Sequence, residues 1–340
     1  MRHPDFQVST FQKVQFLSQA ANYSEKPTQI EVIETHMSWV FLADQSVYKL
    51  KKPVKYEFLD FSTLTARYQN CLEEVRLNRQ LAPNIYLGLV PLTVDAQGKL
   101  HLGTDGTPVD WLVKMRRLPA AGMLDDAIAR GTVRPSDLRP VAELLARFYQ
   151  TAPAVQLSAA AYRQTLEADL QASRQVLVSS EYGLPPEWID RITDSQMMVL
   201  KAEPELFDRR VAENRIVEGH GDLRPQHICL KPEAAIIDRL EFNRTLRILD
   251  PADELAFLAL ECERLGAAWM GDFFLEVYGA TTGDRPPQRL IEFYKSYRAC
   301  LRAKLSLWHI REPGQPGPEQ WLNQARTYLH LADGLLQSRT

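Results

Sequence analysis

The hydrophobic pattern changes once along the chain, at Leu118-Pro119. Before this dipeptide, short apolar runs and runs in which apolar and polar residues alternate predict β-strands. Beyond about Asp125, apolar residues recur mostly at helical spacing. We therefore expect a small sheet lobe followed by a larger helical lobe. The strand-like segments are 30–35, 39–42, 47–51, 88–94 and 109–115.

One helix is expected within the sheet lobe and several within the helical lobe. The first begins near Ser62, a residue type that favours the N-cap, and ends before Ala82-Pro83. The helical lobe is interrupted by a compact patch of short strand-like runs, at 216–217, 227–230 and 235–238. The expected helices of the second lobe are 136–150, 158–178, 186–216, 251–266, 268–280, 287–310 and 319–337.

Composition excludes several classes of protein. The 340 residues carry 40 Lys+Arg against 43 Asp+Glu, a formal net charge of −3, which excludes a strongly cationic nucleic-acid binder. The four cysteines lie far apart and form no CxxC pair or zinc-type cluster. No stretch reaches the roughly 18 apolar residues of a membrane span. We expect a reduced, soluble, cytoplasmic protein without nucleic-acid or membrane partners.

The densest group of polar residues is His220-Gly-Asp-Leu-Arg-Pro-Gln-His227, which lies between two short strand-like runs. A second acid, Asp238, follows the apolar pair Ile236-Ile237. A strand–loop–strand unit of this kind supplies the two carboxylates that phosphoryl transfer uses: one orients the acceptor hydroxyl, and the other holds a divalent cation. The buried-strand pattern before Asp238 supports metal binding, because an unpaired carboxylate is costly there.

The segment His220–His227 resembles the catalytic loop, H-x-D-L-x-P-x-N, of the aminoglycoside phosphotransferase and protein-kinase-like superfamily. Asp238 falls where that family has its metal-binding Asp, and Asp250-Pro-Ala-Asp-Glu-Leu-Ala256 resembles its D-P-x-x-D-L-A segment, with Glu254 in place of the second Asp. Val47-Tyr-Lys49 looks like the third-strand lysine motif, and 113–119 looks like the strand and hinge between lobes.

The resemblance implies an α+β, bilobal protein-kinase-like fold, with a small antiparallel-sheet N-lobe that has one key helix and a larger, mostly helical C-lobe. The implied limits are 1–115 for the N-lobe, 116–119 for the hinge and 120–340 for the C-lobe. Bacterial enzymes of this group, whose substrates are unassigned, often carry a P-loop ATPase domain after the kinase-like domain. This chain has no G-x-x-x-x-G-K-[ST], so a stand-alone version is expected.

The implied activity is ATP-dependent transfer of the γ-phosphate to a hydroxyl of a small molecule, with ATP and Mg²⁺ as cofactors. Asp222 takes the place of the catalytic base, and Asp238 that of the metal ligand. The alternative for Asp222 is a turn or helix cap. Arg224 lies where protein kinases have a phosphate-contacting Lys and would neutralise charge on the transferring group. Its alternative is an ordinary surface or ion-paired arginine.

His227 departs from the family pattern, which has Asn at this position as an oxygen ligand of a second magnesium ion. Imidazole nitrogen suits Mg²⁺ poorly. Three alternatives stay open: His227 hydrogen-bonds Asp222 and holds the loop, it ligates a metal such as Mn²⁺, or the site is impaired. The last alternative corresponds to a regulatory pseudokinase that binds nucleotide with little or no turnover.

Lys49 is the candidate for the α/β-phosphates, and Val47 on the same strand face would lie under the adenine. Lys51 shares that face and is the alternative lysine. A carboxylate on helix 62–81 has to fix the lysine, and the choice is between Glu73 and Glu74. Glu73 is slightly preferred, because Leu77 is an apolar neighbour four residues later.

The remaining nucleotide contacts are expected from main-chain groups. No glycine-rich loop lies between the first two strands, and the turn His36-Met37-Ser38 offers N–H groups and the Ser38 hydroxyl instead. Met115 and Arg116 would offer main-chain groups to the adenine edge. A protein kinase is the remote alternative, opposed by the absence of D-F-G and A-P-E segments from the sequence.

Overall fold

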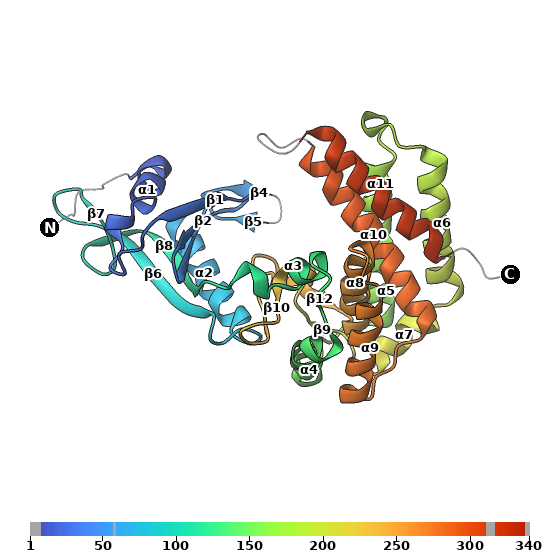
Figure 1. The fold of residues 1–340 in the computed structure, drawn as a ribbon. Coiled ribbons are helices and arrows are strands. Elements are labelled where there is room, and N and C mark those ends of the chain that lie inside the picture. The colour runs from blue at the N-terminus through green and yellow to red at the C-terminus, as the bar shows by residue number, and fades with distance from the viewer. Residues whose placement is uncertain (1–7, 57–58, 311–316, 337–340) are drawn as a thin grey trace. The chain divides into compact units, whose positions relative to one another are not determined.

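The computed structural model describes residues 8–56, 59–310 and 317–336. The chain forms two compact units, which Figure 1 draws as a ribbon. The first, here the sheet unit, comprises 1–127 together with 226–246, and the second, here the helical unit, comprises 128–225 and 247–340. Each unit is a set of residues that pack more densely with one another than with the rest of the chain. The lobe limits predicted from the sequence are a different division and stay a prediction.

A six-stranded antiparallel sheet forms the centre of the sheet unit within the described residues. All five strand-like segments of the early chain are found in it, which confirms the α+β prediction. Lys49 pairs with Val113 and Val47 with Met115, so β3 lies beside β8. In spatial order the strands are β1 (Ile30–Glu34), β2 (Ser38–Ala43), β3 (Ser46–Lys51), β8 (Thr107–Arg116), β6 (Tyr86–Val94) and β7 (Leu100–Leu102).

Each face of the sheet has its own apolar core. On one face, Tyr48 and Leu50 of β3 pack with Leu17 of helix α1 (Thr10–Leu17). On the other face, Cys71 and Val75 of helix α2 (Leu64–Asn78) pack with β6 and β8. Because side chains alternate along a strand, the intervening residues of β3, Val47, Lys49 and Lys51, point to the α2 side.

Helix α2 begins at Leu64, and its N-cap is Thr63, whose hydroxyl accepts from the Ala66 N–H at 3.1 Å. The prediction from Ser62 was therefore one residue early. The hairpin of Lys55–Tyr56 and Leu59–Asp60 was not predicted, because its strands are two residues long, whereas Ile228–Cys229 and Ala235–Ile236 fall within the strand-like runs predicted at 227–230 and 235–238. The short elements of the sheet unit are η1 (Ala20–Asn22), β4 (Lys55–Tyr56), β5 (Leu59–Asp60), η2 (Ala120–Gly122), β10 (Ile228–Cys229) and β11 (Ala235–Ile236), and α3 (Leu124–Ala129) leads into the helical unit.

The helical unit is built around α10 (Gln288–His309), which contributes buried residues to two apolar cores. The predicted helix 186–216 is two helices, because Pro204 has no N–H to continue the hydrogen-bond ladder. The other predicted helices are found within two residues of their expected ends. Besides α10, the helices of this unit are α4 (Pro135–Thr151), α5 (Ala159–Leu177), α6 (Pro186–Ala202), α7 (Glu205–Ala212), α8 (Pro251–Arg264), α9 (Trp269–Thr282) and α11 (Pro318–Leu335), with η3 (Ser180–Tyr182) between α5 and α6.

Two short strands of the helical unit hold the segment that contains His220. β9 (Val217–Glu218) pairs antiparallel with β12 (Ile248–Leu249), and α8 starts directly after β12. The ends of β9 and α8 are therefore neighbours. η4 (Pro225–His227) and η5 (Arg244–Arg247) complete the elements.

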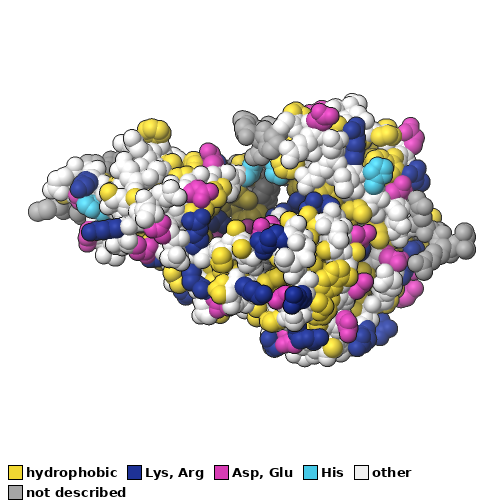
Figure 2. Space-filling model, in the orientation of Figure 1, with side chains coloured by type: hydrophobic (Ala, Val, Ile, Leu, Met, Phe, Trp, Pro, Cys, Tyr) yellow, Lys and Arg dark blue, Asp and Glu magenta, His cyan; other side chains and the backbone are white. Residues whose placement is uncertain are grey.

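The surface agrees with the near-neutral charge of the sequence. On the face drawn in Figure 2, acidic and basic side chains are interspersed among apolar ones. Among the described residues, no helix combines the length and the apolar character needed to cross a bilayer.

Candidate active site

Two lysines of β3 converge on one carboxylate of α2. Lys49 Nζ lies 2.9 Å from Glu74 Oε1, and Lys51 Nζ lies 2.6 Å from Glu74 Oε2. Glu74 and Lys51 are each 1% exposed, so both charges depend on this pairing. Glu74 is therefore the helix carboxylate that contacts the lysine face predicted for β3.

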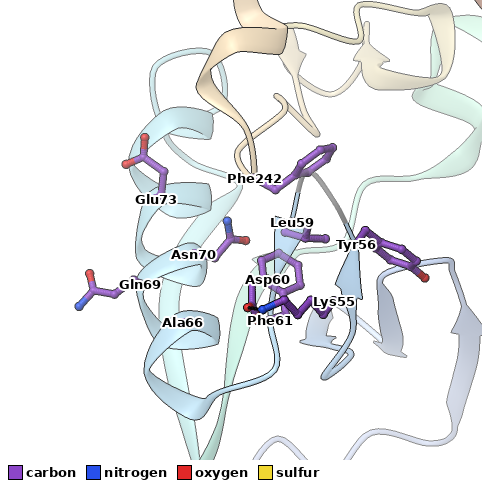
Figure 3. A pocket seen from close by; sticks show the side chains of 10 residues that line it. All are labelled: Lys55, Tyr56, Leu59, Asp60, Phe61, Ala66, Gln69, Asn70, Glu73 and Phe242. Atoms are coloured by element: carbon purple, nitrogen blue, oxygen red, sulfur yellow. Dashed lines mark ion pairs between the residues drawn. The ribbon is translucent and has the colours of Figure 1, made fainter.

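The preference for Glu73 over Glu74 is corrected by this arrangement. Glu73 forms an ion pair with Arg76 at 2.6 Å on the outer side of α2. There it lines a separate cavity of about 560 Å³ together with Asn70 and Phe242 (Figure 3). The buried face of α2 runs through Cys71, Glu74 and Asn78, which follow the helical spacing of three and four residues.

Two further carboxylates reach the lysines from the segment that follows β11. Lys49 Nζ lies 3.2 Å from Asp238 Oδ1, and Lys51 Nζ lies 2.6 Å from Glu241 Oε1. Glu241 is therefore a largely buried partner of Lys51. Glu74, Asp238 and Glu241 therefore all contact the two lysines.

The pKa values of the cluster follow from burial and from these contacts. Burial alone would lower the pKa of Lys49, but Asp238, Glu74 and Glu241 outweigh it and hold that pKa well above its usual range. Burial raises the pKa of Glu241, although Lys51 opposes the shift. The pKa of Glu74 is lowered, because the two lysines outweigh its burial. Both lysines are thus cationic at neutral pH.

The main chain at Asp238 is held in an unusual conformation. Asp238 has a φ of 60°, in the left-handed region that non-glycine residues seldom adopt. Its N–H donates to the buried Tyr86 hydroxyl at 3.0 Å. The next residue, Arg239, is fixed by Asn78 of α2, whose Oδ1 accepts from the Arg239 N–H at 2.8 Å. The surrounding structure therefore determines where the Asp238 carboxylate points.

His227 lies beside Asp238, and these two side chains would hold a divalent cation if one binds here. His227 Nε2 lies 3.6 Å from Asp238 Oδ2, and the Asp238 side chain is 50% exposed. No group of three or more His, Cys, Asp or Glu residues forms a ready-made metal cage in the described part of the chain. Mg²⁺ at nucleotide sites usually takes one or two carboxylates and completes its shell with phosphate oxygens and water. The Asp238 carboxylate suits such an ion, whereas the His227 imidazole suits Mg²⁺ poorly.

The other predicted nucleotide residues lie on the same sheet. Val47 and Met115 pair across β3 and β8, and the Arg116 N–H donates to the Ile85 carbonyl at 2.9 Å. The Arg116 side chain is ion-paired with Glu233. Ser38 is the first residue of β2 and is buried, and its N–H donates to Thr35 Oγ1 at 3.0 Å.

In the helical unit, Glu254 of α8 holds the main chain before Asp222. Its Oε2 accepts from the His220 N–H at 2.8 Å, and its Oε1 accepts from the Gly221 N–H at 2.5 Å. The Tyr149 hydroxyl donates to the same carboxylate at 2.6 Å. A Cβ on Gly219 would lie 2.6 Å from Glu254 Oε2, so only glycine fits there.

Asp222 and Arg224 form an ion pair, with Arg224 Nη2 2.7 Å from Asp222 Oδ2. Asp222 keeps 30% of its side chain exposed. The Asp222 N–H donates to His220 Nδ1 at 3.3 Å, and His220 itself is completely buried. The loop thus presents one carboxylate from a fixed main chain, which is what a proton-accepting group needs.

Several residues of the site were missed or read differently in the sequence. Asp250 caps the start of α8, with Oδ1 accepting from the Ala252 N–H at 2.9 Å, whereas Glu254 binds the main chain of His220 and Gly221. The signal for Glu254 was its place in the D-P-x-x-D-L-A segment. Asn78 and Tyr86 were missed, because their partners lie far away in the sequence.

Comparisons with known proteins give both sequence relatives and solved structures of similar fold. No protein-family model matches the chain. Uncharacterised proteins of Mycobacterium tuberculosis and Mycobacterium bovis are 36% identical over 286 residues, which make up 81% of this chain and 54% of each relative. The chain therefore spans about half the length of the curated relatives that it matches.

Solved structures resemble the whole chain at low sequence identity. A choline/ethanolamine kinase family protein from Mesorhizobium loti has a TM-score of 0.57 and 17% identity, covering 96% of this chain and 95% of its own. A choline kinase from Cryptosporidium parvum has a TM-score of 0.54 and 11% identity, covering 95% and 96%. An AMP-bound spectinomycin phosphotransferase has a TM-score of 0.53 and 11% identity, covering 97% and 100%.

Proposed function

Since the chain has the fold of the aminoglycoside phosphotransferase and protein-kinase-like superfamily, we propose that it is an ATP-dependent phosphotransferase acting on a hydroxyl of a small molecule. The observation that carries the proposal is the pair of contacts made by Lys49, to Glu74 at 2.9 Å and to Asp238 at 3.2 Å. A partly buried strand lysine between a positioning acid and a half-exposed acid suits the binding of phosphate groups and of a cation. The similar kinases and the AMP-bound neighbour support nucleotide as the ligand.

The sheet unit would bind the nucleotide. Lys49 would contact the α- and β-phosphates, with its direction fixed by Glu74. Val47 would lie under the adenine, and main-chain groups of Met115 and Arg116 would meet its edge. Asp238 and His227 would hold Mg²⁺ or Mn²⁺, which supplies charge neutralisation at the phosphates.

The helical unit would bind the acceptor through Asp222 and Arg224. Asp222 would orient the acceptor hydroxyl and take its proton as the new bond forms. Arg224 would neutralise charge on the transferring group. Glu254 acts through the main chain, since it fixes His220 and Gly221 rather than any reacting atom.

A direct assay tests this proposal. The purified chain is incubated with ATP, Mg²⁺ or Mn²⁺ and a panel of hydroxyl compounds, and ADP release is measured. Asp222→Asn is expected to reduce acceptor-dependent release by about 10²–10⁴-fold, whereas Asp272→Asn, at an exposed position in the first turn of α9, leaves it unchanged. Release that survives Asp222→Asn contradicts the assigned base. Nucleotide binding is checked by thermal unfolding of the chain with and without ATP and Mg²⁺. A melting temperature that ATP does not raise contradicts nucleotide binding.

The second candidate is a regulatory pseudokinase, which the imidazole of His227 beside Asp238 favours. His227→Asn separates the two functions. In an enzyme, the Asn variant preserves or increases Mg²⁺-dependent turnover, because an amide oxygen suits Mg²⁺ better. In a pseudokinase, both forms bind nucleotide and neither turns it over.

A further inference from the structure

Lys51 is the more deeply buried of the two β3 lysines. Its side chain is 1% exposed, against 17% for Lys49. Its Nζ lies 2.6 Å from Glu74 Oε2 and 2.6 Å from Glu241 Oε1, and the centroid of the Phe61 ring is 5.1 Å from the same atom. Two carboxylates and one ring thus surround an ammonium group that has three N–H donors. Lys51 is therefore poorly placed to contact a phosphate group, although it shares a strand face with Lys49.

The ion pairs of the two lysines form one continuous chain of contacts, whose ends differ in exposure. Glu74 lies at the centre, because each of its two oxygens takes one lysine. At one end Lys49 contacts Asp238, whose side chain is 50% exposed, and at the other end Lys51 contacts Glu241, whose side chain is 9% exposed. A ligand from solvent can therefore reach the Asp238 end, whereas the Glu241 end offers it almost no surface.

Nucleotide binding would change the partners at the exposed end. In the proposed function, Lys49 contacts the phosphates and Asp238 holds the cation, so the 3.2 Å contact between these two residues has to lengthen. The segment 238–241 then loses one of its contacts with β3. The pair of Lys51 and Glu241 faces neither ligand and can stay formed throughout. It is thus a contact between β3 and this segment that does not depend on the ligand.

The Lys51 ammonium group also connects three elements of the sheet unit. Lys51 belongs to β3, Glu74 belongs to α2, and Glu241 belongs to the segment that carries Asp238. The carboxylate that directs Lys49 and the segment that carries the proposed metal ligand are therefore held by the same atom. Protein kinases control their activity through the positions of these two elements, the helix and the metal-binding segment.

We propose that Lys51 is a positioning residue that keeps α2 and the segment 238–241 assembled on β3 before nucleotide binds, so that movement of these elements does not switch the site. The inference rests on the proposed function, which assigns Lys49 to the phosphates and Asp238 to the cation. Lys51 touches neither ligand. It acts on the direction of Lys49 through Glu74, and on the place of Asp238 through Glu241.

Hydrogen exchange of the nucleotide-free chain tests this assembly without any ligand. The N–H groups of Asp238 and Arg239 are the reporters, because they donate to the Tyr86 hydroxyl at 3.0 Å and to Asn78 Oδ1 at 2.8 Å. Both are expected to be protected in the wild type and to exchange about 10–100-fold faster in Lys51→Met, with no change in α10. Reporters that are unprotected in the wild type, or equally protected in both proteins, overturn the proposal.

A double variant separates positioning from stability. Lys51→Met alone leaves the Glu241 carboxylate without its buried partner, which destabilises the fold. Lys51→Met/Glu241→Leu replaces the pair by apolar side chains, a change that is often neutral. We expect a urea midpoint close to that of the wild type but faster exchange of the reporters, because apolar contacts do not hold position 241 to one point of β3. Wild-type protection in the double variant would show that Lys51 serves stability alone, and would overturn the proposal.

Two single variants complete the set. Lys51→Arg keeps the positive charge and is expected to restore part of the protection that Lys51→Met loses. Lys52→Met is the matched control, because Lys52 is the next residue of the chain and pairs with the exposed Glu34 at 2.5 Å. It is expected to match the wild type in every measurement. Exchange in Lys52→Met as fast as in Lys51→Met would show that the effect is not specific to Lys51 and would overturn the proposal.

Titration calorimetry tests the link to the proposed ligands. Lys51→Met is expected to weaken binding of Mn²⁺ to the ADP-saturated chain by about 10–100-fold, because it frees the segment that carries the metal ligand. Without metal, it is expected to weaken ADP binding less than Lys49→Met does, because Lys51 touches no phosphate. Equal losses of metal-free ADP binding in these two variants would show that Lys51 contacts the phosphates, and would overturn the proposal.

These measurements distinguish the inference from the function on which it rests. If the wild type binds neither ADP nor Mn²⁺ but its reporters lose protection in Lys51→Met, the proposed function fails and the assembly by Lys51 stands. If ADP and Mn²⁺ bind but Lys51→Met changes neither the exchange rates nor the Mn²⁺ affinity, the proposed function stands and Lys51 is not a positioning residue.

Discussion

Asn78 hydrogen-bonds both main-chain groups of Arg239: its Oδ1 accepts from the Arg239 N–H at 2.8 Å, and its Nδ2 donates to the Arg239 carbonyl at 3.3 Å. An amide side chain that brackets one residue in this way fixes the main chain on both sides of it. The residue before Arg239 is Asp238, whose left-handed conformation needs such support. The last turn of α2 therefore positions the proposed metal ligand.

Asn78→Ala is expected to weaken binding of the ATP–Mg²⁺ complex about tenfold and to lower the free energy of unfolding by about 1–3 kcal/mol, because buried main-chain groups lose their partners. Titration calorimetry and urea denaturation measure the two effects. Gln69→Ala, at an exposed position of the same helix, is the matched control. Nucleotide binding that is unaffected in a destabilised Asn78→Ala variant would show that Asp238 does not depend on this bracket.

The two adjacent glutamates of α2 offer a sharp comparison. Glu74→Gln leaves Lys51, which is 1% exposed, with one carboxylate fewer, and breaking a buried ion pair typically costs about 3–5 kcal/mol. Glu73→Gln removes an exposed pair with Arg76, and we expect a change within about 0.5 kcal/mol. Urea denaturation compares the variants, and ATP titration is expected to show weakened binding for Glu74→Gln alone. Equal effects of the two substitutions would contradict the assignment of Glu74.

The sequence predicted the α+β fold and most elements, because strand and helix periodicities are local. It also predicted the shared face of Val47, Lys49 and Lys51, which depends only on alternation along one strand. The choice between Glu73 and Glu74 depends on which side of α2 meets the sheet. Cys71, Glu74 and Asn78 are spaced so that they share one face of the helix, and this face is the buried one. The prediction instead preferred Glu73 because of one apolar neighbour, Leu77.

The contacts that sequence reasoning missed are those between distant segments. Lys51 and Glu241 are 190 residues apart, and nothing in the local pattern of either one names the other. Asn78 reads as an ordinary residue near a helix end, and Tyr86 reads as a core aromatic. Their roles arise because 226–246 packs within the sheet unit. A contact of this kind depends on the tertiary fold and leaves no periodic signal.

Buried thiols give a pH-dependent prediction. Burial raises the pKa of Cys71, Cys262 and Cys300 to about 12 in each case, against about 8.5 for an exposed thiol. The folded protein therefore holds more protons than the unfolded chain above about pH 8.5, so stability is expected to fall as the pH rises beyond that value. Urea denaturation between pH 7 and 10 measures the fall. A thiol reagent at pH 8 should modify these cysteines only after unfolding, and rapid modification of the native protein would contradict their burial.

Glu254→Gln tests whether the loop that carries Asp222 is held by a carboxylate. An amide has one oxygen, so it can replace only one of the acceptor contacts to His220 and Gly221, and its NH₂ group would face an N–H donor. We expect kcat to fall about 10–100-fold with little change in KM for ATP, since the substitution displaces the base and leaves the sheet unit untouched. Steady-state ADP release measures this, and Glu276→Gln, at an exposed position on α9, is the control. A normal kcat together with reduced stability of the Glu254→Gln variant would show that Glu254 acts only in folding. The contacts of Glu254 with His220 and Gly221 would then no longer support the assignment of Asp222 as the base.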